Sequence, residues 1–415
     1  MKRMNWLTKL LAVVLCLHVL LTCAPLGVAL ADEEPVKLLL FNQQDDASIM
    51  DAMIEAYKQV NPNVVIEPTY INALDYPDKI LIYLAGGQEM DIVYINTISE
   101  YYDYASKGVI ADLTDSIKES GYDLSALPPM FQEMTYKDKM FALPYKRTSW
   151  FLFYNKDIFD KEGIDYPTQM TWDEFRTLAK QLTKEENDEK QWGTYFVDWI
   201  LNYMCVQENV SLFDDDLEGS LRRSYQLVYD LYYTDKSSMD LKEQVATKAD
   251  WLATWEKGNV AMYVMGNWLV PLGGQDTPIN YGVAPLPVPE GVEAGTTWGQ
   301  GGFLAIANSS QHKREAYDFI QWACGPEGNA ITASQGFLPS VASESSNQAL
   351  ADFMGTDEYI DNMLNTRLMP EFDNLPHSEE LRTIVAEEGN LYLMQEQDLD
   401  TTIQNVLSRR AKVLG

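Results

Sequence analysis

An alternation of apolar strands with amphipathic helices over residues 36–95 constrains the fold of this 415-residue chain more than any other feature. The helices repeat apolar residues every three to four positions, whereas the strands are short continuous apolar runs. The expected strands are Val36–Phe41, Val64–Ile66 and Asp91–Ile95, and the helices between them are Ala47–Tyr57 and Pro77–Leu84. This order predicts a parallel sheet with right-handed crossovers, and hence an α/β fold.

The segment Trp150–Phe175 adds a strand and a capped helix to this pattern. The run Trp150–Tyr154 has no polar alternation, which predicts a strand buried on both faces of a mostly parallel sheet. Asn155 ends the strand. Thr171 and Glu174 have the spacing of a capping box, which predicts that a helix starts there.

The same criteria predict further elements along the rest of the chain. These are a helix at Ile98–Ser106 ending at Gly108, a mainly helical region at Trp172–Trp255, a strand at Val260–Val264, an extended stretch at Tyr281–Pro287, a strand at Phe303–Ile306, a helix at Lys313–Ala323 closed by a glycine-rich turn at Gly325–Gly328, and a helical tail from Ala349. The chain exceeds the size at which one core usually keeps growing, so two lobes are expected.

The N-terminus has the features of a secretory signal. Basic residues precede an apolar run at Leu10–Leu21, and Ala29-Leu30-Ala31 predicts cleavage after Ala31. A rival interpretation places a lipid anchor on Cys23, but Thr22 before it is larger than the usual Gly or Ala, so we rank it second. No later run is apolar and long enough to span a bilayer. The mature chain is therefore expected outside the cytoplasm.

Charge and composition narrow the classes of partner. The formal net charge is −31, which argues against nucleic acid and anionic membranes because both require a basic surface. Cys205 and Cys324 are expected to be buried free thiols, with a disulfide as the alternative. His312 and His377 have no metal-like partner at helical spacing, so neither a metal nor another cofactor is expected.

Four motifs occur in an order that is typical of one family. They are Asp91-Ile92-Val93, then Leu143-Pro144 with Tyr154-Asn155-Lys156, then Trp255–Met262 with Gly266-Asn267-Trp268, and finally Tyr281–Pro287 with Gly336–Pro339. In this order the chain resembles the extracellular solute-binding proteins of ABC importers, in the carbohydrate-binding group that includes maltose-binding proteins.

The resemblance implies a two-lobed, hinge-connected periplasmic-binding-protein-like fold (type II) with a ligand cleft between the lobes. Its crossings would lie near Pro144, Pro285 and Pro339, which assigns residues 32–144 and 286–338 to the first lobe and residues 145–285 and 339–415 to the second. It also implies a monomer that is not an enzyme, captures a sugar or oligosaccharide and delivers it to ABC permease subunits. The alternatives are a ligand-binding partner of a membrane sensor and a secreted glycoside hydrolase, which would need two spaced carboxylates.

In the first lobe, candidate ligand groups follow the predicted strands at the carboxyl ends, where open α/β sheets bind ligands. We expect Gln43 and Asp45 to contact ligand and Asp46 to cap the next helix. Tyr94 and Asn96 end the third strand by the same reasoning, and Asn96 could instead be a turn former.

The family pattern implies that Tyr145, Arg147 and Thr148 face the cleft after the first crossing. Arg147 would donate paired hydrogen bonds to a ligand, or would form a salt bridge across the hinge instead. Asp198 and Trp199 lie where the family contributes polar and aromatic contacts, and core packing is the alternative for Trp199.

Aromatic groups further along the chain complete the predicted site. The family places a stacking aromatic at Trp268, which could otherwise pack under its loop. Trp298, Gly299 and Gln300 lie in a glycine-rich run that would let a ligand approach the backbone, or would serve a turn or bulge. This run precedes a strand and lacks the Lys-Ser/Thr ending of a phosphate-binding loop, so nucleotide binding is rejected.

Overall fold

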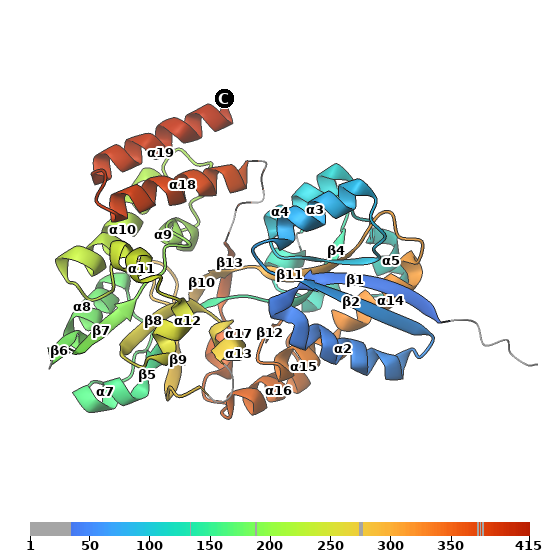
Figure 1. Cartoon of the computed structure of the whole chain (residues 1–415), viewed down its shortest axis with the longest axis horizontal. Coiled ribbons are helices and arrows are strands. Elements are labelled where there is room, and N and C mark those ends of the chain that lie inside the picture. Colours follow the sequence, from blue (N-terminus) through green and yellow to red (C-terminus); the bar gives the residue numbers. More distant parts are fainter. Residues whose placement is uncertain are drawn as a thin grey trace, which may run out of the picture.

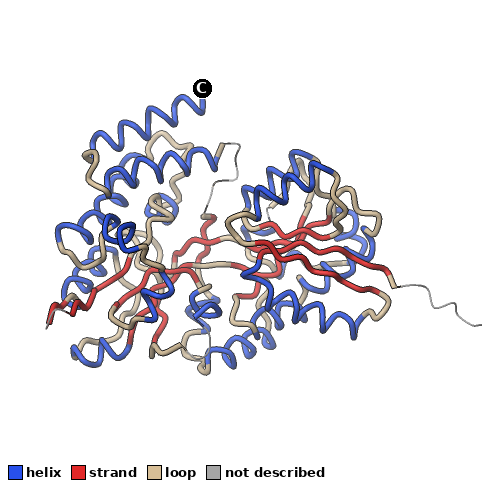
Figure 2. The backbone as a smooth tube through the Cα atoms, viewed as in Figure 1, coloured by secondary structure: helices blue, strands red, loops and turns tan. Residues whose placement is uncertain are grey.

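The structure, a computed structural model, describes residues 35–132, 134–186, 189–273, 277–371, 373, 375 and 377–415. The predicted signal segment and Cys23 lie outside the described residues. Strands form the centre of two lobes, and helices surround them (Figure 2). In Figure 1 the first lobe, with β1, lies on the right and the second lobe, with β5, lies on the left.

A six-stranded sheet in the order β12-β4-β11-β3-β1-β2 forms the first lobe. Its strands are β1 (Val36–Gln43), β2 (Val64–Ile71), β3 (Ile92–Ile95), β4 (Ala142–Arg147), β11 (Gly301–Ile306) and β12 (Leu338–Pro339). Strand β1 is parallel to both β2 and β3, which confirms the predicted parallel order. Strand β11 runs antiparallel to β3 and β4, so the sheet as a whole is mixed.

Helices cover both faces of this sheet, with α3 and α4 on one side and α2 and α15 on the other (Figure 1). They are η1 (Gln44–Asp46), α2 (Ala47–Val60), α3 (Tyr76–Gly86), α4 (Ile98–Lys107), α5 (Thr114–Ser120), η2 (Leu124–Ala126), α6 (Pro129–Gln132), α14 (Lys313–Ala323) and α15 (Pro326–Ser334). The predicted bounds of α14 are confirmed. The predicted glycine-rich turn is wrong in part, because Pro326 starts α15.

The second lobe has a five-stranded sheet in the order β6-β7-β8-β5-β9. Its strands are β5 (Trp150–Asn155), β6 (Lys184–Glu186), β7 (Glu189–Tyr195), β8 (Val260–Gly266) and β9 (Tyr281–Ala284). Strand β5 is buried throughout, as predicted, but it pairs antiparallel with both β8 and β9, so the expected mostly parallel surroundings are wrong. The region expected to be mainly helical contains β6 and β7.

The helices of the second lobe and of the tail lie around this sheet, except α16, which packs against α15 of the first lobe. They are α7 (Lys156–Glu162), α8 (Trp172–Leu182), α9 (Tyr203–Gln207), α10 (Glu218–Tyr229), the π-helical turn η3 (Asp230–Thr234), α11 (Leu241–Thr247), α12 (Trp251–Glu256), α13 (Leu269–Gly273), α16 (Glu344–Met354), α17 (Ile360–Leu364), α18 (Ser378–Leu393) and α19 (Leu399–Leu414). The capping box of Thr171 and Glu174 at the start of α8 is confirmed.

The chain passes between the lobes later than the prolines predicted. Strand β4 pairs with β11 as far as Arg147, so the first crossing is at Thr148–Ser149. Leu286 still packs in the core of the second lobe, and the second crossing is at Gln300, between β10 (Thr296–Gly299) and β11. The third passage follows β12 and leads to β13 (Arg367–Pro370), which pairs parallel with β10.

Each lobe has its own hydrophobic core. Cys205 lies in the second core and Cys324 in the first, and both are free thiols, which confirms that prediction and rules out the disulfide between them. Burial raises the pKa of Cys205 to about 12, so this thiol is unreactive. Within the described ranges, no helix is both long and apolar enough to cross a bilayer.

Candidate ligand-binding site

Three tryptophans of the second lobe pack against one another and are here called the aromatic wall: Trp199 and Trp268, which reach the surface, and Trp150, which is buried beside them. The rings of Trp199 and Trp268 are nearly parallel, at 28° and 6.4 Å between centroids. Trp150 meets Trp268 edge-on at 5.2 Å. Trp199 is 40% exposed and Trp268 is half-buried, so both present ring area to solvent. This surface can stack on the apolar face of a ligand.

The backbone positions the aromatic wall. Trp268 follows the end of β8, and a Cβ at Gly266 would lie 2.0 Å from the Trp268 ring, so only glycine lets the ring lie on this strand end. Trp298 lies on β10, is 1% exposed and packs at 5.6 Å against Trp150. Trp298 therefore supports the wall from behind rather than presenting a face.

The candidates of the first lobe gather at the carboxyl ends of β1 and β3. Gln43 is buried, Asp45 is exposed on η1, and Asn96 is half-buried. The hydroxyl of Tyr94 donates a hydrogen bond of 2.7 Å to Asn96 Oδ1, and the Tyr94 ring is buried. Asp45 and Asn96 are thus the polar groups of this set that reach the surface.

Asp46 does not cap α2 through its side chain, which makes that prediction wrong. Its carboxylate instead accepts hydrogen bonds from the Tyr145 hydroxyl and from Lys146 Nζ. The Lys146 ammonium also lies 5.3 Å from the centroid of the Tyr94 ring. Tyr145, expected to face the cleft, is fully buried in this cluster because β4 places it inside the first lobe.

Arg147 and Thr148 lie at the first crossing. Arg147 is buried, and its Nη2 donates to the carbonyls of Met363 and Leu364 at 3.3 and 2.9 Å. No carboxylate in the described part of the chain pairs with Arg147, so the alternative of a salt bridge across the hinge is not found there. Burial lowers the pKa of Arg147 to about 10. Arg147 therefore ties β4 to α17.

Thr148 and Gln300 join the first two crossings by reciprocal hydrogen bonds. The Thr148 amide donates to the Gln300 carbonyl at 2.7 Å, and the Gln300 amide donates to Thr148 Oγ1 at 3.0 Å. A Cβ at Gly299 would lie 1.9 Å from the Thr148 carbonyl oxygen. Gly299, the last residue of β10, is needed for this close approach of two backbone segments.

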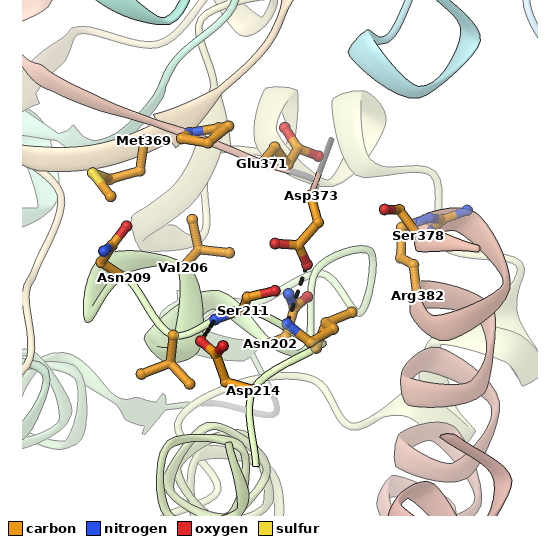
Figure 3. A pocket seen from close by; sticks show the side chains of 13 residues that line it. Asn202, Val206, Asn209, Ser211, Asp214, Met369, Glu371, Asp373, Ser378 and Arg382 are labelled. Carbon is orange, nitrogen blue, oxygen red and sulfur yellow. Dashed lines mark hydrogen bonds between the residues drawn. The ribbon is translucent and has the colours of Figure 1, made fainter. Parts of the chain in front are cut away.

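A pocket of about 220 Å³ lies beside the third passage, between the α9 loop, β13 and α18 (Figure 3). We call it the crossing pocket. Its polar lining includes Asn202, Ser211, Asp214, Glu371, Asp373 and Arg382. The sequence analysis missed this pocket because it treated the chain beyond Ala349 as helical and so overlooked β13. The only sequence signal was Met369-Pro370, since proline favours an extended preceding residue.

Glu371 is the most perturbed group of the crossing pocket. It is 7% exposed, and its amide donates to the Gly299 carbonyl at 3.0 Å. Burial raises the pKa of Glu371 to about 7, although the nearby Trp150 indole and Gln300 amide partly offset this effect. The Glu371 carboxyl thus lies near Trp150, which follows the first crossing, and Gln300, which forms the second.

The candidate residues form two groups, one on each lobe. The contacts of Tyr94 and Asn96 stay within the first lobe, and those of Trp199 and Trp268 stay within the second. Asp198 is half-buried next to Trp199. Across the described residues, no cluster of three metal-binding side chains occurs.

Two α/β lobes joined by crossing strands define the two-lobed class of binding proteins, and comparison with known proteins agrees. A sugar transporter from Rhizobium etli in an open conformation superposes with a TM-score of 0.81 at 27% identity, covering 91% of this chain and 99% of that one. An ABC substrate-binding protein from Listeria monocytogenes in complex with cycloalternan has the same fold, with a TM-score of 0.81 at 21% identity, covering 92% and 99%.

The sequence comparisons give the family. A binding protein of Brucella abortus is 21% identical over 295 residues, 69% of this chain and 71% of that protein. The family model of the bacterial extracellular solute-binding proteins matches residues 42–330. Because this match spans more than half of the chain, the protein belongs to the bacterial extracellular solute-binding proteins.

Proposed function

We propose that this protein captures a neutral sugar or oligosaccharide outside the cytoplasm and delivers it to the permease of an ABC importer, without chemical turnover. The observation that carries the proposal is the solvent-facing pair of Trp199 and Trp268 at the edge of the second lobe. Flat aromatic faces stack on the C–H faces of sugar rings. The sugar transporter and the cycloalternan complex among the similar structures support this ligand class.

The proposed mechanism is closure of the lobes on the ligand. Trp199, Trp268 and Asp198 would contact it from the second lobe, and Asp45 and Asn96 would contact it from the first. A ligand that contacts both lobes stabilises the closed form only to the extent that it binds that form more tightly than the open one. The permease would then recognise the closed surface.

The export route is part of the same proposal. Cleavage after Ala31 would release the mature chain, and a lipid on Cys23 is the alternative that would tether it. Mass spectrometry of the protein from its native membrane and supernatant fractions distinguishes the two, because a lipidated chain would begin at Cys23.

Calorimetric titration of the mature protein with maltose, mannotriose and cycloalternan tests the proposed function. We expect saturable binding of at least one of these sugars at one site. Chromatography of the same mixtures should show the sugar unchanged, since a binding protein does not cleave its ligand. Binding of peptides or amino acids with no response to any sugar in a broad panel would overturn the proposal.

Replacing Trp268 with alanine should weaken binding of the responding sugar by about 30-fold or more, the loss typical of a central aromatic contact. The melting temperature should fall only slightly, because one face of the Trp268 ring is open to solvent and the ring adds little to the core. The matched control is Trp322→Ala, since Trp322 is equally half-buried but packs on Tyr57 and Phe319 in the first lobe. Loss of affinity in both variants would make Trp268 a structural residue.

Ligand binding should make the molecule more compact. The three passages between the lobes restrict their motion to a hinge around Thr148, Gln300 and the chain before β13. Small-angle scattering with and without a saturating sugar should therefore show a smaller radius of gyration and an unchanged molecular mass. An unchanged radius, with binding confirmed in the same buffer, would indicate a preformed site within one lobe.

A further inference from the structure

Arg147 lies where the strands that connect the lobes come together. It is the last residue of β4, and the first crossing follows it directly. In the sheet of the first lobe it pairs with Gly301, the first residue of β11, and with Leu338 of β12. Strand β11 follows the second crossing, and β12 precedes the third passage. The backbone of Arg147 therefore belongs to the first lobe and is adjacent to all three passages.

The helix that receives this side chain, α17, is attached to the second lobe. Ile360 and Met363 are buried in the core of that lobe, and α17 packs against β9. Just before α17, a Glu358 carboxylate oxygen lies 3.5 Å from Lys156 Nζ at the start of α7. The same ammonium lies 5.2 Å from the centroid of the Tyr359 ring. Apolar and polar contacts thus fix α17 to the second lobe, near the middle of the molecule (Figure 1).

The Arg147 guanidinium joins these two parts of the molecule. Its Nη2 donates to the carbonyls of Met363 and Leu364 at 3.3 and 2.9 Å. These are the last two carbonyls of α17, and the final carbonyls of a helix have no partner within it. The buried cation needs acceptors and the helix end needs donors, so each supplies what the other lacks. A side chain of the first lobe therefore closes a helix of the second.

The environment of Arg147 makes this contact costly to break. The side chain is buried, no carboxylate among the described residues pairs with it, and its Nε has no acceptor there. The positive charge therefore depends on the two carbonyls of α17. Removing them would leave a buried charge without compensation, whereas a surface ion pair separates at little cost because water replaces the partner. The contact is thus a firm restraint between the lobes.

We propose that Arg147 acts as an inter-lobe strap, which restricts the range of angles between the lobes by holding α17 of the second lobe to β4 of the first. Rotation about Thr148 and Gln300 must either carry α17 along or pull its last carbonyls away from the guanidinium. The strap thereby limits how much of the closed form exists before a ligand arrives, and this fraction scales the apparent affinity. The inference goes beyond the proposed function, since it holds for a ligand of any class.

The test measures the distance between the lobes in protein without ligand. Spin labels are attached to cysteines that replace Gln59 on α2 and Gln181 on α8, which are both exposed. The native Cys205 and Cys324 are buried free thiols, so they should stay unlabelled. Double electron–electron resonance then gives the distribution of distances between the two labels. We expect Arg147→Met to broaden this distribution relative to the labelled wild type, because α17 is no longer held to β4.

Two further variants control for loss of an arginine and for misfolding. Arg176→Met is the matched control, because the Arg176 guanidinium pairs with Asp230 and Asp235 and all three residues belong to the second lobe. It should leave the distribution unchanged. Arg147→Lys keeps the charge and can still donate to a carbonyl, so it should broaden the distribution less than Arg147→Met. It also provides the answer if the methionine variant does not fold.

The outcomes separate the strap from a ligand contact and from the proposed function. Distributions as narrow as that of the wild type in both Arg147 variants would overturn the strap. If binding of the responding sugar were also weakened in these variants, Arg147 would be a ligand contact instead. Because the distances are measured without ligand, a failed strap leaves the proposed function standing. Broadened distributions in a protein that binds no sugar would support the strap and overturn the proposed function alone.

Discussion

Replacing Lys146 with methionine is expected to lower the free energy of unfolding by about 3–5 kcal/mol, the usual result of removing one partner from a buried ion pair. The side chains of Lys146 and Asp46 are only 8% and 2% exposed. Methionine fills the space of the lysine stem, but it leaves the Asp46 carboxylate buried with the Tyr145 hydroxyl as its remaining side-chain donor. An uncompensated charge in the core would cause the loss.

Urea unfolding of the first-lobe transition measures this effect. The double variant with Asp46→Asn should recover part of the loss, because neither charge then remains alone. Lys37→Met is the matched control, since the Lys37 pair with Glu67 is on the surface, with side chains 55% and 52% exposed, and should be worth at most about 1 kcal/mol. Equal losses in Lys146→Met and Lys37→Met would show that burial of the pair has no energetic consequence.

The free energy of unfolding should also depend on pH through Glu371. Burial raises its pKa from the ordinary 4.5 to about 7, so between these values the folded chain holds a proton that the unfolded chain has released. The stability from this group is fully present below pH 4.5 and is lost as the pH rises through 7. At 1.36 kcal/mol per unit, the total loss is about 3 kcal/mol.

Glu371→Gln removes this titration, because glutamine is neutral at every pH. The variant should match the wild type near pH 4.5 and exceed it in unfolding free energy above pH 7, as measured by urea titrations of the whole protein at both values. Burial also raises the pKa of Glu100 in the first lobe to about 7, so the variant should retain part of the slope. If the unfolding free energies of the wild type and the variant changed with pH in parallel, the raised pKa of Glu371 would be contradicted.

The sequence by itself determined the elements whose causes are local. Apolar spacing gave the bounds of α14 and its inward residues, and the side-chain and backbone bonds of the capping box at Thr171 span only three residues. Gly108 is a natural C-cap in the sequence, and in the structure it ends α4 in the left-handed conformation, with φ of 66°. The order of the motifs shared with the solute-binding family predicted the two-lobed architecture, which the comparisons support.

Only the tertiary structure decided which polar groups are available to a ligand. Asp46 has the sequence features of a helix cap, but its partner Lys146 lies 100 residues away, and the buried pairing outweighs the local one. The same long-range packing buries Tyr145 and Arg147 and leaves Trp199 exposed. Glu371 meets Trp150 and Gln300 only because three distant segments cross at one place. Periodicity and capping act over a few residues, so they contain no information about contacts between segments that are far apart in the sequence.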